Sequence, residues 1–118
     1  MMTDDFITEE TEFLSRFLKT ILFPQSSQFS LEEYPFIGSA ADLQAELIQL
    51  TQKKEFCKAE DLLFLAIEQD TGEESLQVAV WFYHHLSLLD AKELEAHDFS
   101  MDEVLEGLQE IERRAVAG

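Results

Sequence analysis

The chain has 118 residues, of which 46% are hydrophobic and ten are Phe, which is enough for one folded domain with its own core. Its 25 acidic and 8 basic residues give a formal charge of −17, which argues against nucleic-acid and anionic-membrane binding and favours solubility or a basic partner. No apolar run approaches the ~20 residues that span a bilayer. The acidic opening segment 1–5 lacks the basic start of a signal peptide, so we expect a cytoplasmic protein.

Glycine and proline, which interrupt regular structure, number only four and two. We therefore predict an all-α fold in one domain, 1–118, with five or six helices packed mostly as antiparallel neighbours. The first helix is predicted over 5–23 and ends before Pro24. Two adjacent rows of apolar residues predict one broad buried face on it: Phe6, Phe13, Phe17 and Ile21, and Leu14, Leu18 and Leu22.

Segment 24–39 is the longest predicted break, because it is rich in residues that form turns and loops. Its apolar residues, from Phe29 to Ile37, indicate that it lies across the helical core. A short helical turn is predicted near 31–34.

Two helices are predicted next, the first after a capping box at Ser39–Asp42 and the second over 56–69, with Gly72 as a left-handed cap. The spacing of their apolar residues resembles that of a single tetratricopeptide repeat: Leu43, Leu47, Leu50, Phe56, Ala59, Leu63 and Ala66. No second copy of the pattern follows, so the sequence predicts one helical hairpin and not an array.

The fourth helix is predicted over 73–89, and its middle, 78–83, is apolar on every side. Six such residues also suit a buried strand, but the length of the segment and the lack of a partner strand favour a central helix. It is expected to pack on the hairpin, while the terminal helices close the two sides. A short element at 90–97, with a possible capping box at Asp90–Glu93, and a last helix after the capping box Ser100–Glu103 complete the chain.

Trp81, Tyr83, His84 and His85 form the most distinctive stretch. Side chains this close in sequence must cover all faces of one helix, so some belong to the core. Those that reach the surface would form an interaction patch, because Trp and Tyr dominate binding hot spots. The expected partner is another protein or a second copy of the chain.

The alternative is a small enzyme or metal-binding protein that uses His84, His85, His97 and nearby carboxylates. Adjacent histidines point about 100° apart on a helix, so His84 and His85 cannot both bind one ion from one face. His97 could approach them only through the tertiary fold. No HExxH, paired CxxC, EF-hand or phosphate-binding loop is present, and we assign no catalytic, cofactor-binding or metal-ligating residue. Cys57, beside Phe56, is the one cysteine and is interpreted as a small core residue.

Several stretches resemble an uncharacterised family of small helical proteins from Gram-positive bacteria. These stretches are 5–7, 59–64, Phe82-Tyr83 with Leu86 and Leu89, 93–100 and 106–111. The resemblance covers most of the chain apart from 24–39. It implies an all-helical, tetratricopeptide-like domain without an assigned activity, and it carries over no catalytic residue. The leading hypothesis, from the helical hairpin, the many aromatic residues and the lack of an active-site motif, is a protein-interaction or adaptor module whose partner is another protein or a second copy of the chain.

Overall fold

The computed structural model describes residues 2–23, 30–69 and 73–117, with side chains from residue 7 onward. This part of the chain folds into helices and contains no strand, which confirms the all-α prediction. The elements in chain order are α1 (Met2–Leu22), the short 3-10 helix η2 (Leu31–Glu33), α2 (Gly38–Gln52), α3 (Phe56–Gln69), α4 (Glu74–Ser87), α5 (Ala91–Ala96) and α6 (Met101–Ala117).

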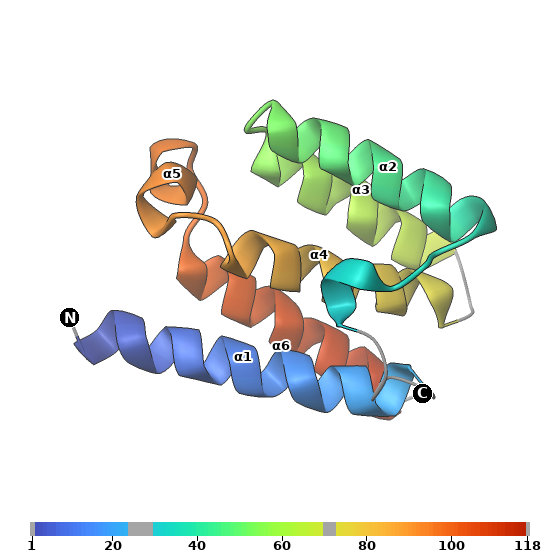
Figure 1. The fold of residues 1–118 in the computed structure, drawn as a ribbon, viewed down its shortest axis with the longest axis horizontal. Coiled ribbons are helices and arrows are strands. Elements are labelled where there is room, and N and C mark those ends of the chain that lie inside the picture. Colours follow the sequence, from blue (N-terminus) through green and yellow to red (C-terminus); the bar gives the residue numbers. More distant parts are fainter. Residues whose placement is uncertain (1, 24–29, 70–72, 118) are drawn as a thin grey trace.

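Helix α4 lies at the centre of the molecule, between two pairs of helices (Figure 1). The hairpin of α2 and α3 covers one side, and α1 and α6 cover the other. The prediction that the terminal helices close two different sides is therefore wrong. They pack against each other and run in the same direction. Each helix has an apolar face, and the two faces are buried against each other and against α4.

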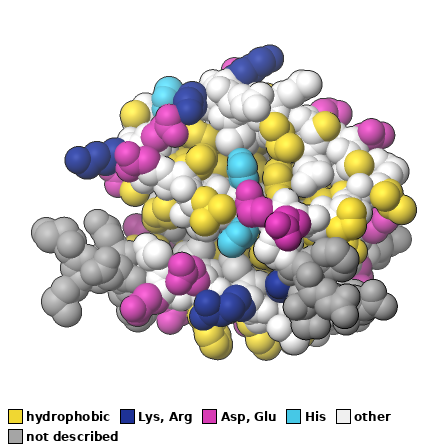
Figure 2. All heavy atoms as spheres, viewed as in Figure 1, with side chains coloured by type: hydrophobic (Ala, Val, Ile, Leu, Met, Phe, Trp, Pro, Cys, Tyr) yellow, Lys and Arg dark blue, Asp and Glu magenta, His cyan; other side chains and the backbone are white. Residues whose placement is uncertain are grey.

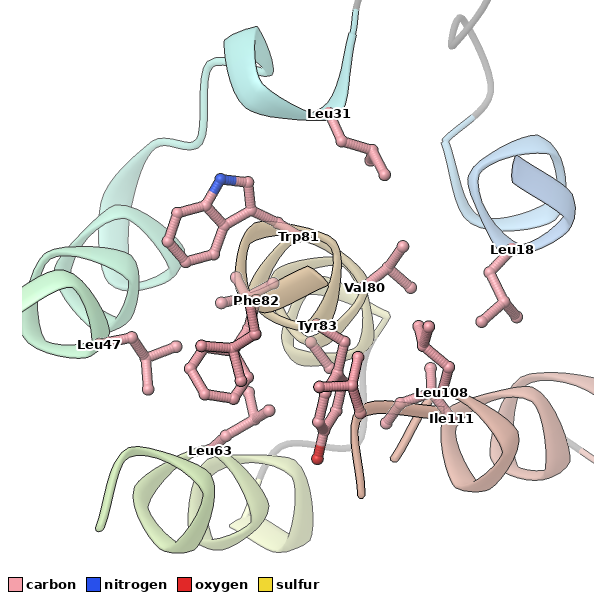
Figure 3. Close-up of a cluster of buried hydrophobic side chains, with 14 of the residues drawn as sticks. Leu18, Leu31, Leu47, Leu63, Val80, Trp81, Phe82, Tyr83, Leu108 and Ile111 are labelled. Atoms are coloured by element: carbon pink, nitrogen blue, oxygen red, sulfur yellow. The ribbon is translucent and has the colours of Figure 1, made fainter. Parts of the chain in front are cut away.

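The prediction of a helix at 78–83 is confirmed, and all six of these residues are buried. Consecutive side chains of α4 point to different neighbours (Figure 3): Val80 points towards Leu18 of α1, and Phe82 towards Leu47 and Leu63 of the hairpin. A helix that is apolar all round needs partners on every side. The central position of α4 provides them.

One of the predicted capping boxes forms in full, and a second keeps only its capping residue. The backbone N–H of Ser100 donates to the Glu103 carboxylate at 2.9 Å, and the Glu103 N–H donates back to Ser100 Oγ at 3.2 Å, so this capping box is complete. Asp90 also caps α5, but its carboxylate accepts from the N–H of Lys92 and the Glu93 side chain instead pairs with Lys54 at 2.6 Å.

The predicted capping box at Ser39–Asp42 is wrong. Helix α2 already begins at Gly38, and its N-cap residue Ile37 has no side-chain capping bond. Gly38 has φ +64, a conformation that glycine adopts without strain. It therefore lets the chain turn into the helix before Ser39. The predicted cap at Gly72 lies outside the described residues.

The connection between α1 and α2 lies against the core as far as it is described. The predicted helical turn is confirmed as η2, and Leu31 is buried against the core (Figure 3). Tyr34 packs edge-to-face on both Phe23 and Phe36, with ring centroids 4.7 and 4.9 Å away. These contacts fix the segment 30–37, while 24–29 lies outside the described residues.

Candidate functional site

The aromatic stretch of α4 does not assemble at the surface of the folded chain. Trp81 is 3% exposed and Tyr83 is fully buried, so the expectation that they contribute to a surface patch is corrected. Figure 3 shows the Trp81 ring between α2 and η2 and the Tyr83 ring directed towards α3 and α6. Both rings fill the space between helices, because α4 is enclosed on all sides.

Tyr83 instead takes part in a contact between three helices. Its hydroxyl donates to the Glu60 carboxylate of α3 at 2.6 Å, and its ring lies against Gly107 of α6. Burial raises the pKa of the Glu60 carboxyl, the hydrogen bond from Tyr83 opposes that rise, and Glu103 adds to it. Burial and the bond to Glu60 also raise the pKa of Tyr83 far above its usual range. The hydroxyl therefore acts as a fixed donor and not as an acid.

An acidic hollow lies beside this contact, between α3 and α6. Its walls are Glu60, Asp61, Phe64, Glu103, Glu106, Gly107 and Glu110. The guanidinium groups of Arg113 and Arg114 bind Glu110 and hold the pKa of that carboxyl below its usual range. Across the described residues, no three potential ligands are placed to hold a metal ion, so the hollow is a negatively charged surface without a formed coordination site.

The histidines of the alternative hypothesis serve separate contacts. His85 stacks on Trp81, with centroids 5.1 Å apart, and its Nδ1 lies 3.6 Å from the Glu32 carboxylate. Burial lowers the pKa of His84. His97 follows α5 and lies edge-on to Phe56. Among the described side chains, these three do not form a metal site with each other or with carboxylates.

Cys57 is exposed at the surface of α3, which corrects its interpretation as a core residue. Its Sγ lies 3.7 Å from the Asp98 carbonyl oxygen, to which the thiol donates. Desolvation raises the pKa of this thiol, and the nearby carboxylates of Glu103 and Glu60 raise it further. The reactive thiolate is therefore disfavoured.

The exposed face of α1 is the feature that the sequence analysis missed. Phe13 is 63% exposed, Phe17 39% and Ile21 43%, although all three were predicted to be buried. We call these three residues the α1 stripe. The helix buries the neighbouring row instead: Ile7, Thr11, Leu14, Ser15, Leu18 and Leu22.

Helix α1 packs against α4 and α6, and these contacts bury only one of its two apolar rows. A signal was available in the sequence. Glu10 falls within the arc of the α1 stripe, whereas the buried row is continued by Ile7 and the small polar residues Thr11 and Ser15. From Ile7 onward, the row that contains no charged residue is the one that is buried.

Figure 2 shows hydrophobic side chains projecting from the lower edge of the molecule, directly below a group of cations. In Figure 1 the same edge is formed by α1. Arg16 and Lys19 of α1 line a hollow there with Glu12, Ser15, Ser30, Leu31 and His84. At about 100° per residue, the two α1 cations lie on the flank of the helix next to the stripe.

Comparison with known proteins gives a family and no activity. No curated protein and no solved structure matches the chain. Within the described residues, no helix has the length and hydropathy needed to cross a bilayer. A family model does match residues 1–116, and the chain belongs to this family, the family of unknown function DUF6483.

Proposed function

We propose that this protein is a helical protein-interaction module that binds its partner through the α1 stripe. The observation that carries the proposal is the exposure of Phe13, Phe17 and Ile21. They follow each other at i, i+4 and i+8, so they line one face within an arc of about 80°. This is the spacing of the anchor residues with which one helix packs into a groove or against another helix.

The charge around the stripe supports the same function. From Ile7 to Leu22, α1 carries three carboxylates, Glu9, Glu10 and Glu12, and two cations, Arg16 and Lys19. With two cations against three carboxylates, this stretch of the helix has a formal charge of −1, whereas the whole chain has a charge of −17. A partner that approaches along α1 meets less repulsion and desolvates fewer unpaired charges than elsewhere on the surface.

Other parts of the molecule agree with an adaptor role. The α2–α3 hairpin carries the spacing of a tetratricopeptide unit, a motif typical of protein-binding domains, and it leaves α1 unobstructed on the other side of α4. The exposed free thiol of Cys57 suits a reducing compartment, and we place the module in the cytoplasm.

The test is photo-crosslinking in the cells that make the protein. A photoreactive phenylalanine analogue replaces Phe17, or replaces Leu65 of α3, which is 52% exposed and serves as the matched control. We expect a defined protein adduct from position 17 and none from position 65, and we expect Phe13→Gln to abolish that adduct. Adducts are identified by mass spectrometry.

The proposal fails if position 17 gives no adduct, or gives the same adducts as position 65. Loss of the adduct through unfolding is excluded by circular dichroism of purified Phe13→Gln. This variant should keep the wild-type melting temperature to within about 2 °C, because Phe13 is 63% exposed and surface substitutions usually change stability by less than about 0.5 kcal/mol.

A further inference from the structure

We propose that the partner of the α1 stripe is a second copy of this chain, with the two α1 helices packed side by side and antiparallel. This inference rests on the proposed function and names its partner. It is carried by an independent observation, the order of charges along α1.

The charges of α1 are segregated by sign. From Ile7 onward, the first half of the helix carries Glu9, Glu10 and Glu12, and the second half carries Arg16 and Lys19. Neither cation forms an ion pair with another described residue. A parallel copy would place like charges together, whereas an antiparallel copy places the acidic half of each helix against the basic half of the other.

One register satisfies both cations at once. Glu12 and Arg16 lie two residues on either side of Leu14, and Glu9 and Lys19 lie five residues on either side of it. A two-fold axis at the level of Leu14 therefore sets Glu12 level with Arg16 of the second copy, and Glu9 level with its Lys19. The symmetry repeats each pair, so the interface contains four ion pairs.

These four charged residues also lie on the same flank of α1, as the antiparallel pairing requires. At about 100° per residue, Glu9, Arg16, Glu12 and Lys19 occupy an arc of about 80° on one side of Phe13, and Phe17 and Ile21 lie on the other side. A two-fold axis perpendicular to the helices brings the same flank of both copies together. The charges therefore meet charges and the α1 stripe meets itself, with Phe13 about 3 Å along the axis from Phe17 of the second copy.

The assembly stops at two copies, because an isologous interface uses the same patch on both chains. Each chain carries −17, so the dimer must also overcome mutual repulsion at long range. Salt at 0.15 M screens charges beyond about 8 Å. The contacts of the stripe and its ion pairs act at shorter distances than this.

The test is sedimentation velocity of the full chain over a concentration series in 0.15 M salt. The wild type should shift from 13.6 kDa to twice that mass as concentration rises. Arg16→Glu with Lys19→Glu makes the flank wholly acidic, and Glu9→Lys with Glu12→Lys makes it wholly basic. Each double variant alone should dimerise roughly 100-fold more weakly, because four favourable pairs become unfavourable.

Mixing the two double variants restores four opposite-charge pairs, so a heterodimer should form at least as tightly as the wild-type dimer. Lys53→Glu with Lys58→Glu is the matched control: it changes the net charge by the same amount as the acidic variant but lies on the other side of α4, and it should dimerise nearly as well as the wild type. Melting temperatures confirm that every variant is folded.

Three results would overturn the inference: a wild-type chain that stays monomeric at 200 μM, double variants that dimerise like the wild type, or a mixture that forms no heterodimer. If the chain is monomeric but position 17 still gives an adduct with a different protein, the homodimer is contradicted and the interaction module is supported. A chain without any adduct at position 17 would remove both.

Discussion

Gly107 shows how closely single residues determine the packing of α4 against α6. A Cβ atom at this position would overlap the Tyr83 ring and lie 2.6 Å from Tyr83 Oη. Tyr83 cannot move aside without loss, because its hydroxyl donates to Glu60 and its ring is fully buried. Glycine at 107 is therefore required by a close approach of two helices and not by backbone conformation.

We predict that Gly107→Ala lowers the free energy of unfolding by about 1–3 kcal/mol, as overpacked core substitutions do. Helix propensity alone would raise it by about 1 kcal/mol, so the two explanations differ in sign. Urea unfolding measures the difference. In a double-mutant cycle, Tyr83→Leu should cost less in the Gly107→Ala background than in the wild type. A more stable Gly107→Ala protein would contradict the close packing.

The N-termini of the helices show when a local sequence pattern is enough to predict a capping box. The capping box at Ser100 forms as the spacing predicts, because both of its bonds are local and need nothing from the rest of the fold. The equally plausible box at Ser39 does not form, because the helix already begins at Gly38, two residues before a cap at Ser39 would start it. A cap is chosen by how the chain enters the helix, and this depends on the preceding segment.

This difference gives a paired prediction. Ser100→Ala should destabilise the protein by about 1 kcal/mol, because it removes the acceptor of the Glu103 N–H. Ser39→Ala should change stability by less than about 0.5 kcal/mol, because its side chain caps nothing. Both values come from urea unfolding under the same conditions. If Ser39→Ala were the costlier change, the start of α2 described above would be incorrect.

The whole molecule carries far more negative charge than its ion pairs neutralise. Carboxylates line the hollow between α3 and α6, and among the described residues the cations of α6 form ion pairs with Glu110 at its end. Two charges 10 Å apart interact by about 0.4 kcal/mol in water, and salt removes most of this. Repulsion within the hollow is therefore a continuing cost of the folded state.

We predict that raising NaCl from about 20 to 200 mM increases the free energy of unfolding by about 1 kcal/mol, because several such repulsions are screened at once. The measurement is urea unfolding at micromolar protein. Glu103→Gln with Glu106→Gln, which neutralises two walls of the hollow, should reduce this gain. A loss of stability with salt would mean that ion pairs such as Lys54–Glu93 outweigh the repulsion.

The sequence by itself determined the helical class, the central position of α4 and the local caps at Asp90 and Ser100, because these follow from periodicity, scarcity of Gly and Pro, and contacts within a few residues. Only the tertiary structure decided which of two apolar rows on α1 is buried, that Trp81 and Tyr83 are core residues, and that α1 packs beside α6. A row of apolar residues indicates that a helix face can be buried. Whether it is buried depends on how much surface the neighbouring helices offer, and on α1 they leave Phe13, Phe17 and Ile21 exposed.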